Sequence, residues 1–306
     1  MTSKKFQRML DCPKGMKRST YFYQKQEGIL GFLFTPGERF PVIRENEGFA
    51  AELAPLGIEL HSFCTFNCTY CNFKKKNRFI HNSRYANREK VYNLFSIFHI
   101  RDEIAKRKIK DPVLLSPNCD VFSGTTSRIL FLHEVLGVFE QTGVPVRLLT
   151  KGGMRTLKKI ERIRKIKKVL EYGTTVLSLN LDYWRILEPN VPSPYDRLAA
   201  LNAIRRERIP NFLVMSPILS YEDAKNVILK SAEYTDRYVL GAFEGKKEIK
   251  DLLGIQESYS DTVEQTVKLL NSLGKKWYAS KDLQKKAKGV ILNPPSLEEF
   301  WNKEGE

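Results

Sequence analysis

Three cysteines lie close together in this 306-residue chain, as Cys64, Cys68 and Cys71. Three residues separate the first pair and two separate the second. Thiolates at such short spacing are typical ligands of a metal centre. A structural zinc site needs four ligands in a closed tetrahedron. A [4Fe–4S] cluster held by only three thiolates leaves one iron open for chemistry.

The zinc alternative requires a fourth ligand from elsewhere in the chain. His61 and His81 flank the cysteines and are the candidates. His61 lies inside a predicted strand, where a lone histidine is more often a core residue, and no second pair of closely spaced cysteines follows. A zinc-stapled nucleic-acid binding module without catalysis therefore stays an alternative.

The chain around the cysteines alternates between strand and helix patterns. Predicted strands cover 57–63, 112–117, 144–150, 175–180, 212–215 and 237–243, and predicted helices cover 88–108, 128–140, 156–172, 194–208 and 221–235. Such alternation is typical of parallel β/α units. We predict an α/β fold, a partial (β/α)6 TIM-type barrel over 55–245, with an N-terminal extension (1–54) and a short C-terminal helical tail (246–306).

The carboxyl ends of the predicted strands define where a site should lie. In parallel β/α folds ligands bind at this edge, and the cysteine loop follows the first strand directly. Polar residues at the other strand ends are therefore candidates: Ser116, Asn118, Cys119, Asp120, Lys151, Ser178, Asn180 and Ser216.

The charge balance favours a polyanionic partner. Lys and Arg number 51 against 35 Asp and Glu, for a formal net charge of +16. Neutralising phosphates dominates nucleic-acid affinity, so we expect DNA or RNA as a partner; an incidental basic surface, a small anionic substrate or an acidic protein is the alternative. Residues 74–78, just after the cysteines, would hold phosphate, whereas 158–168 keep helical spacing and fit a solvated helix face.

Composition also indicates the cellular setting. Apolar residues make up 42% of the chain, enough for a packed core, and no apolar run approaches the length needed to cross a membrane. No secretory signal precedes the first strand. Five cysteines, three of them clustered, fit a reducing environment, so we expect a cytoplasmic protein without membrane contact.

The cysteine segment as a whole resembles the radical S-adenosylmethionine (SAM) superfamily. The resemblance rests on the cysteine spacing, on Tyr70 just before the third cysteine, and on the position after the first barrel strand. A narrower resemblance to the spore photoproduct lyase family covers roughly residues 57–220. Its elements, in order, are Thr150-Lys151, Leu187-Glu188-Pro189, Arg197-Leu198 and Pro217-Ile218.

This resemblance implies a cofactor set and a reaction. Cys64, Cys68 and Cys71 would ligate a [4Fe–4S] cluster, and SAM would occupy its open iron. An electron from a donor such as flavodoxin or ferredoxin would cleave SAM to methionine and a 5′-deoxyadenosyl radical, which abstracts hydrogen from the substrate. The substrate would be a nucleic-acid base, in lesion repair or base modification; a peptide or small metabolite is the alternative.

The resemblance also suggests roles for single residues. Tyr70 would pack near the adenine, Ser116 and Asp120 would bind the amino end of SAM with Asp120 favoured, Lys151 would pair with its carboxylate, and Ser178 and Asn180 would reach the ribose. Cys119 would return a hydrogen atom to a substrate radical. Simple capping of strand ends or helix starts is the alternative for the polar residues, and apolar packing is the alternative for Cys119.

The chain departs from the family pattern at two places. The second strand is followed by Ser116-Pro-Asn-Cys119-Asp120, and Thr150-Lys151 is followed by two glycines. The glycine-glycine-glutamate element that binds the SAM amine in many members of the superfamily is absent.

Overall fold

The structure is a computed structural model of the whole chain. It describes residues 20–24, 29–33, 43–60, 64–71, 90–92, 96–123, 126–158, 160–242, 251, 253–254, 259–287, 290 and 292–302. His61, His81 and residues 74–78, named in the sequence analysis, lie outside the described residues. Within the described part, no helix is both long and apolar enough to cross a membrane.

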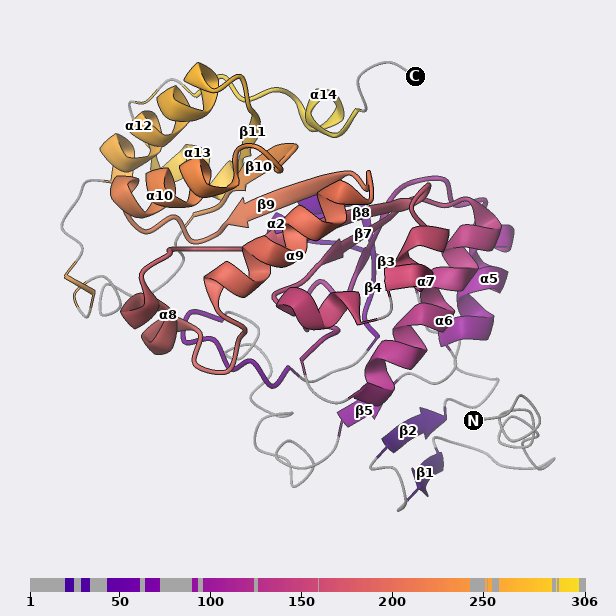
Figure 1. The fold of residues 1–306 in the computed structure, drawn as a ribbon. Helices are drawn as coiled ribbons and strands as arrows, with labels where there is room; N and C mark the ends of the chain where they lie inside the picture. Colours follow the sequence, from indigo (N-terminus) through magenta and orange to yellow (C-terminus); the bar gives the residue numbers. More distant parts are fainter. Residues whose placement is uncertain are drawn as a thin grey trace.

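A twisted, open sheet forms the centre of the molecule (Figure 1). Among the described residues it has eight strands in the order β11-β10-β9-β8-β7-β6-β4-β3. Their bounds are β3 Ile43–Glu45, β4 Leu56–Ile58, β6 Val113–Leu115, β7 Val146–Leu149, β8 Leu170–Thr175, β9 Asn211–Met215, β10 Arg237–Leu240 and β11 Lys276–Ala279. Neighbouring strands pair in parallel except β3, which runs antiparallel to β4. The predicted partial barrel is confirmed.

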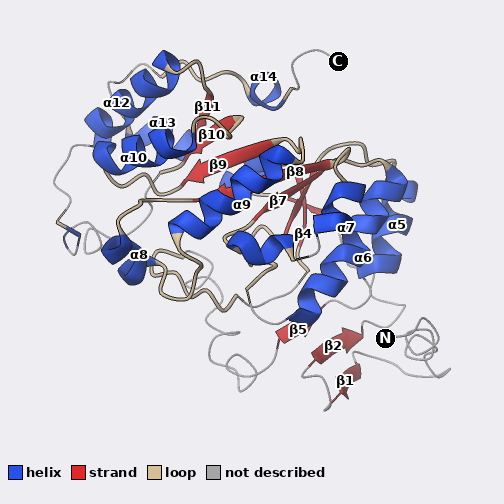
Figure 2. Cartoon of the chain, viewed as in Figure 1, coloured by secondary structure: helices blue, strands red, loops and turns tan. Residues whose placement is uncertain are grey.

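Most of the helices cover the outer face of this sheet (Figure 2), and two of them, Gly48–Leu53 and Leu297–Trp301, pack on its inner face. Their bounds are α2 Gly48–Leu53, α5 Ser96–Arg107, α6 Thr126–Thr142, η1 Gly153–Leu157, α7 Ile160–Lys165, α8 Leu181–Leu187, α9 Pro194–Arg206, α10 Tyr221–Ser231, α12 Tyr259–Ser272, α13 Lys281–Lys286 and α14 Leu297–Trp301. Ile58, Leu115 and Leu148 pack against the helices together with Leu136 of α6. The alternate residues of the strands, such as Leu114, face the barrel interior in a second apolar cluster.

The small sheet near the N-terminus is separate from the barrel. It contains β1 (Thr20–Gln24), β2 (Ile29–Leu33) and β5 (Lys90–Tyr92), with β2 in the centre. In Figure 1 it lies below α6 and apart from the main sheet.

The fourth β/α unit differs from the sequence prediction. The single helix predicted over 156–172 is wrong: η1 and α7 are short, and β8 already begins at Leu170. The strand predicted over 175–180 is also wrong, because β8 ends at Thr175. All six residues of β8 are buried, so the strand lacks the alternation of polar and apolar residues that identifies a half-buried strand.

The chain beyond residue 246 adds a strand that the sequence did not predict. β11 pairs in parallel with β10 and extends the sheet. After it, α14 places Trp301 against the barrel, where the Arg147 guanidinium stacks 3.6 Å from the indole centroid. Buried ion pairs join Glu171 to Arg147 (2.5 Å) and Arg237 (3.0 Å). This packing places α14 against the inner face of the sheet, where Trp301 also contacts Phe212 of β9.

Candidate functional site

The cysteine loop, residues 64–71, lies at the carboxyl end of β4 and is anchored to α8. The Thr69 N–H donates to the Leu187 carbonyl at 2.9 Å. Asn67 adopts φ 52°, a left-handed conformation that asparagine tolerates better than most residues and that lets the loop turn tightly. The Cys71 N–H then donates to the Cys68 carbonyl at 3.2 Å.

The three thiols share one environment. Cys68 is buried and Cys64 and Cys71 are half-buried, and all three pack with Phe66 and Val191. Burial raises the pKa of the Cys68 thiol to about 11, and the nearby Lys151 ammonium opposes that rise. Binding a metal must therefore displace these protons.

The donor set fits an iron–sulfur cluster. Among the described residues, no three His, Cys, Asp or Glu side chains converge closely enough to hold a single metal ion. A cubane sets a different requirement, because each thiolate binds its own iron. Three thiols on one anchored loop, each packed in the same small cluster, meet that requirement.

Lys151 connects the cysteine loop to the rest of the barrel. Its ammonium lies 3.7 Å from the Cys68 sulfur and 3.7 Å from Glu188 Oε1. It also lies 5.2 Å from the centroid of the Tyr70 ring. Burial alone would lower the pKa of Lys151, but the Cys68 thiolate and Glu188 outweigh it and raise that pKa. The structure thus brings the predicted Lys151 and Tyr70 together with the cysteines.

Glu188 is the centre of a buried network. Its side chain is 2% exposed, accepts a hydrogen bond from the Tyr70 hydroxyl and pairs with Arg197. Arg197, 1% exposed, also donates to the Thr175 carbonyl at 2.6 Å. Burial raises the pKa of Glu188, but Arg197 and Lys151 more than offset this and hold the pKa below its ordinary value. Glu188 and Arg197 carried part of the family resemblance, yet the sequence gave them no role.

Asp120 holds the Lys151 segment in place. One carboxylate oxygen accepts from the Phe122 N–H (2.9 Å) and the Thr150 hydroxyl (2.8 Å). The other accepts from the Lys151 N–H at 2.6 Å. Burial raises the pKa of Asp120 despite these hydrogen bonds. Asp120 therefore joins the segments that follow β6 and β7 through the hydrogen bonds that its carboxylate accepts.

Ser116 and Cys119 lie on the same segment. Ser116 adopts φ 49°, and its hydroxyl accepts from the Leu60 N–H at 3.2 Å, which ties the end of β6 to the start of the cysteine loop. Cys119 is 2% exposed. This residue is thus positioned close to the loop but in an enclosed place.

Ser178 and Asn180 make their hydrogen bonds on a different side of the barrel mouth. The Ser178 hydroxyl donates to Asp223 at the start of α10 and accepts from the Asn180 N–H at 2.9 Å. The Asn180 side chain caps α8 by accepting from the Asp182 N–H at 2.8 Å. Both residues line an open cavity of about 810 Å³ that also includes Tyr195.

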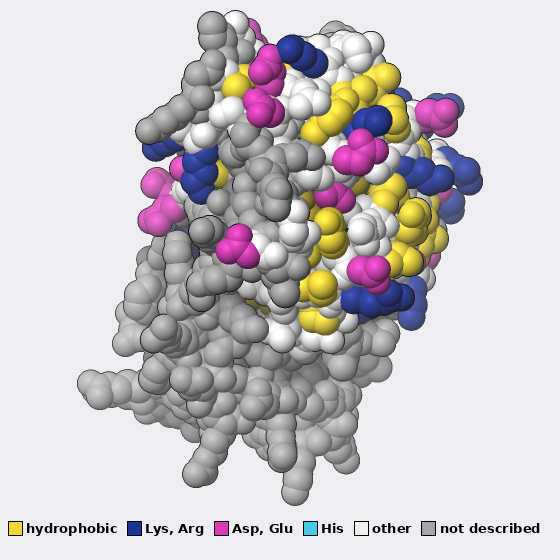
Figure 3. Space-filling view, turned by 90° about the vertical axis from the view of Figure 1, so that its left-hand side faces the viewer, with side chains coloured by type: hydrophobic (Ala, Val, Ile, Leu, Met, Phe, Trp, Pro, Cys, Tyr) yellow, Lys and Arg dark blue, Asp and Glu magenta, His cyan; other side chains and the backbone are white. Residues whose placement is uncertain are grey.

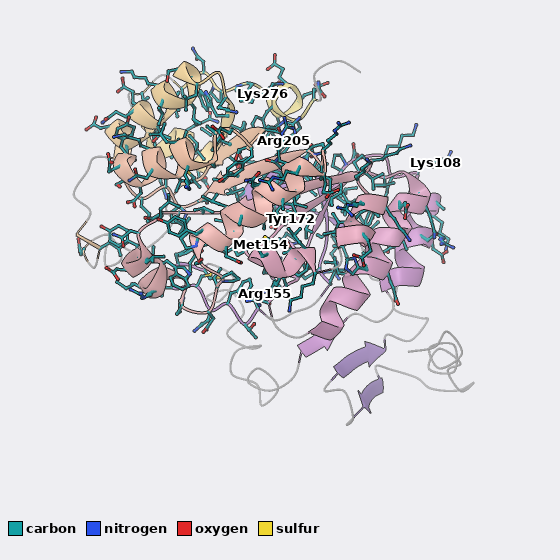
Figure 4. All side chains as sticks on the ribbon, viewed as in Figure 1. Lys108, Met154, Arg155, Tyr172, Arg205 and Lys276 are labelled. Atoms are coloured by element: carbon teal, nitrogen blue, oxygen red, sulfur yellow. The ribbon has the colours of Figure 1, made fainter. Side chains whose placement is uncertain are left out.

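Two further residues at the loop were not predicted. The Arg155 guanidinium lies 5.7 Å from the centroid of the Phe66 ring. Figure 4 shows Arg155 on the lower side of the molecule, away from the labelled Lys108 and Lys276. Glu59 directly follows β4 and accepts two hydrogen bonds from Asn118, through the backbone N–H (3.2 Å) and the side-chain amide (3.0 Å). A single acidic residue in an apolar strand pattern gives no sequence signal for a site.

The sequence also matches a family model that spans this region. The radical SAM superfamily model matches residues 58–230, which include the cysteine loop and the four parallel strands β6 to β9 of the main sheet that follow it. The chain belongs to the radical SAM superfamily and is an enzyme of this class. Its cofactors are a [4Fe–4S] cluster and SAM.

Solved structures of two kinds resemble the fold. Spore photoproduct lyase complexed with a dinucleoside spore photoproduct aligns with a TM-score of 0.56 at 12% identity, covering 77% of this chain and 78% of the lyase. Streptococcus suis SuiB bound to SAM aligns at 0.54 and 12% identity, covering 77% of this chain, and SuiB bound to its precursor peptide SuiA aligns at 0.55 and 14%, covering 80%. The chain spans about half the length of SuiB. No curated protein sequence matches the chain significantly.

These findings set the chemistry of the loaded site. When bound, the cluster and SAM supply a one-electron reductive cleavage that yields a 5′-deoxyadenosyl radical. The three cysteines would hold the cluster, and Lys151 and Glu188 fix the loop that carries them.

Proposed function

We propose that this radical SAM enzyme acts on a base of DNA or RNA, in lesion repair or base modification of the spore photoproduct lyase type. A small electron-transfer protein such as flavodoxin or ferredoxin would supply the electron in the cytoplasm. The observation that carries the proposal is the net charge of +16, together with basic side chains at the barrel mouth.

The basic groups at the mouth suit a phosphate backbone. Arg155 lies against the cysteine loop, and the exposed Lys158 follows η1. A base presented to the barrel interior must leave its stack, and phosphate contacts at the rim hold the strand while it does so. The resemblance to a lesion-bound lyase structure is consistent with this reading.

Within this proposal, Cys119 is the hydrogen donor to the substrate radical. The residue is buried on the segment after β6, which Ser116 ties to Leu60 just after β4. A thiol suits this step because its S–H bond is weak.

The experiment is binding of labelled single-stranded and duplex DNA and RNA, followed by fluorescence anisotropy between about 50 and 200 mM salt. We expect log affinity to fall linearly with log salt. An Arg155→Ala/Lys158→Ala double variant should weaken binding more than the matched Lys167→Ala/Lys168→Ala variant, whose lysines are exposed on the segment just before β8. An affinity that does not change with salt concentration would count against a nucleic-acid substrate at the mouth. So would a larger loss of affinity in the control variant than in the Arg155→Ala/Lys158→Ala variant.

The open cavity favours a second candidate, a peptide substrate. Its lining combines the acidic Glu222 and Asp223 with the exposed Leu229 and Tyr195. Figure 3 shows the side of the molecule that carries α8 and α10, where hydrophobic side chains gather beside charged ones. In this case Leu229→Asp should reduce substrate-dependent SAM cleavage, whereas an enzyme that acts on a base at the mouth should be unaffected by that change.

A further inference from the structure

Glu59 has one carboxylate oxygen that no described residue hydrogen-bonds. Its Oε2 accepts both hydrogen bonds from Asn118, at 3.2 and 3.0 Å. Its Oε1 is buried and has no hydrogen-bond partner among the described residues. A buried carboxylate oxygen without a partner is costly, so a native structure that keeps one usually has a use for it.

The register of β4 directs Glu59 into the barrel. Ile58 belongs to the core that packs against the helices, and Gly57 pairs with Leu114 of the inner cluster. Because side chains alternate along a strand, Glu59 shares the inner face at the carboxyl end. Burial raises the pKa of Glu59 to about 7 despite the hydrogen bonds from Asn118 and Cys119.

Glu59 is linked to the cluster ligand Cys64 through one short segment. The segment that binds it, Asn118 to Asp120, continues to the backbone of Asp120, which hydrogen-bonds Cys64. Across the site, the Lys151 ammonium lies 3.7 Å from the Cys68 sulfur. The carboxylate after β4 is thus connected to Cys64 through residues 118–120, and the ammonium after β7 contacts Cys68 directly.

We propose that Glu59 binds the α-ammonium group of SAM through its free oxygen. The chain lacks the glycine-rich acidic element that performs this task in many relatives, so another acceptor is needed. Asp120 is the acceptor expected from sequence, but both of its carboxylate oxygens already accept hydrogen bonds, from Phe122, Thr150 and Lys151. Glu59 has an oxygen without a hydrogen bond among the described residues, and Lys151 supplies the complementary charge for the carboxylate of SAM. This inference rests on SAM as the cofactor and not on the identity of the substrate.

The test compares equilibrium binding of three ligands to the full chain with its cluster reconstituted under anaerobic conditions. SAM and S-adenosylhomocysteine carry the ammonium, whereas 5′-methylthioadenosine lacks the amino-acid end. Glu59→Gln should weaken the first two by about 10- to 100-fold, the range expected for one charge-assisted hydrogen bond, and leave the third within about twofold. Glu59→Asp, which keeps the charge, should restore part of the loss. The exposed Glu161→Gln variant on α7 should match the wild type for all three ligands.

Thermal unfolding and the cluster absorbance of each variant verify that the fold and the cluster persist. Unchanged SAM affinity in Glu59→Gln overturns the inference, because Glu59 would then not bind SAM. An equal loss for 5′-methylthioadenosine also overturns it, because the defect would then not concern the ammonium. If the wild type itself bound no SAM, the cofactor assignment and this inference would both be wrong, whereas a wild type that binds SAM but no nucleic acid contradicts only the proposed substrate.

Discussion

The Lys151 ammonium lies 3.7 Å from the sulfur of Cys68 and at the same distance from a carboxylate oxygen of Glu188. One buried cation therefore interacts with a cluster ligand and with the network that holds the loop. Charges and hydrogen bonds near ligand sulfurs set the reduction potential of iron–sulfur clusters. The arrangement makes Lys151 a residue that should stabilise the reduced, more negative cluster.

Replacing Lys151 by Met should lower the reduction potential of the bound cluster by tens of millivolts, on the order expected for losing one nearby buried charge. An EPR-monitored redox titration of the SAM-free protein measures this directly. Lys158→Met removes an exposed lysine just after η1 and should leave the potential unchanged. A potential that shifts equally in both variants would show that Lys151 acts only through overall charge.

Replacing Glu188 by Gln should destabilise the fold by about 3 kcal/mol, because Arg197 then loses its buried partner. Urea unfolding of the apo-protein measures the change. The matched control is Glu207→Gln, which removes the partner of the largely exposed Arg164 and should cost far less, because surface ion pairs contribute little to stability. Equal losses in the two variants would contradict the role of the buried network.

The buried pair of Glu188 and Arg197 also predicts that the stability of the protein depends on pH in the acid range. Arg197 and Lys151 hold the pKa of Glu188 below its ordinary value of 4.5, so the folded state favours the ionised form. This contribution to stability is present above pH 4.5 and is lost as pH falls through the lowered pKa. The stability difference between wild type and Glu188→Gln should therefore shrink under acid conditions; a constant difference down to about pH 3 would argue against it.

The contribution of Glu59 to stability should change with pH in the opposite direction to that of Glu188. Burial raises its pKa from 4.5 to about 7, so its contribution to stability is present below pH 4.5 and is lost as pH rises through 7. At pH 8, Glu59→Gln should therefore be more stable than the wild-type apo-protein, by at most about 3 kcal/mol, and the two should converge near pH 4. Denaturant unfolding at both pH values decides this; a Gln variant that is less stable at pH 8 would contradict it.

Cys119→Ala should retain the cluster and the cleavage of SAM, because Cys119 is not one of the three loop cysteines. With a nucleic-acid substrate, the variant should consume SAM but release a changed product, since the substrate radical lacks its hydrogen donor. Mass spectrometry of the digested nucleic acid reads this out. A product pattern identical to that of the wild type would show that Cys119 serves only as a buried apolar residue.

Local patterns in the sequence were enough to predict the barrel and the cysteine loop. The side-chain network could not be predicted, because its residues meet only in the folded structure. Alternating strand and helix signals predicted the parallel sheet, and three thiols after the first strand predicted the centre. β8 began earlier than expected because a fully buried strand loses its alternation. Glu188 and Arg197 meet Tyr70 only in three dimensions, and Asn180 proves to cap α8. Glu59 gave no signal because its unused oxygen is a property of packing.

The central claim is that the open site on the cysteine loop cleaves SAM. The most direct test is anaerobic incubation of the cluster-loaded chain with SAM and dithionite, with 5′-deoxyadenosine quantified by chromatography. The account predicts formation of 5′-deoxyadenosine by the wild type, and loss of both the cluster and this product in Cys71→Ala. A wild-type protein with a full cluster that forms no 5′-deoxyadenosine, or a Cys71→Ala variant that still does, would contradict it.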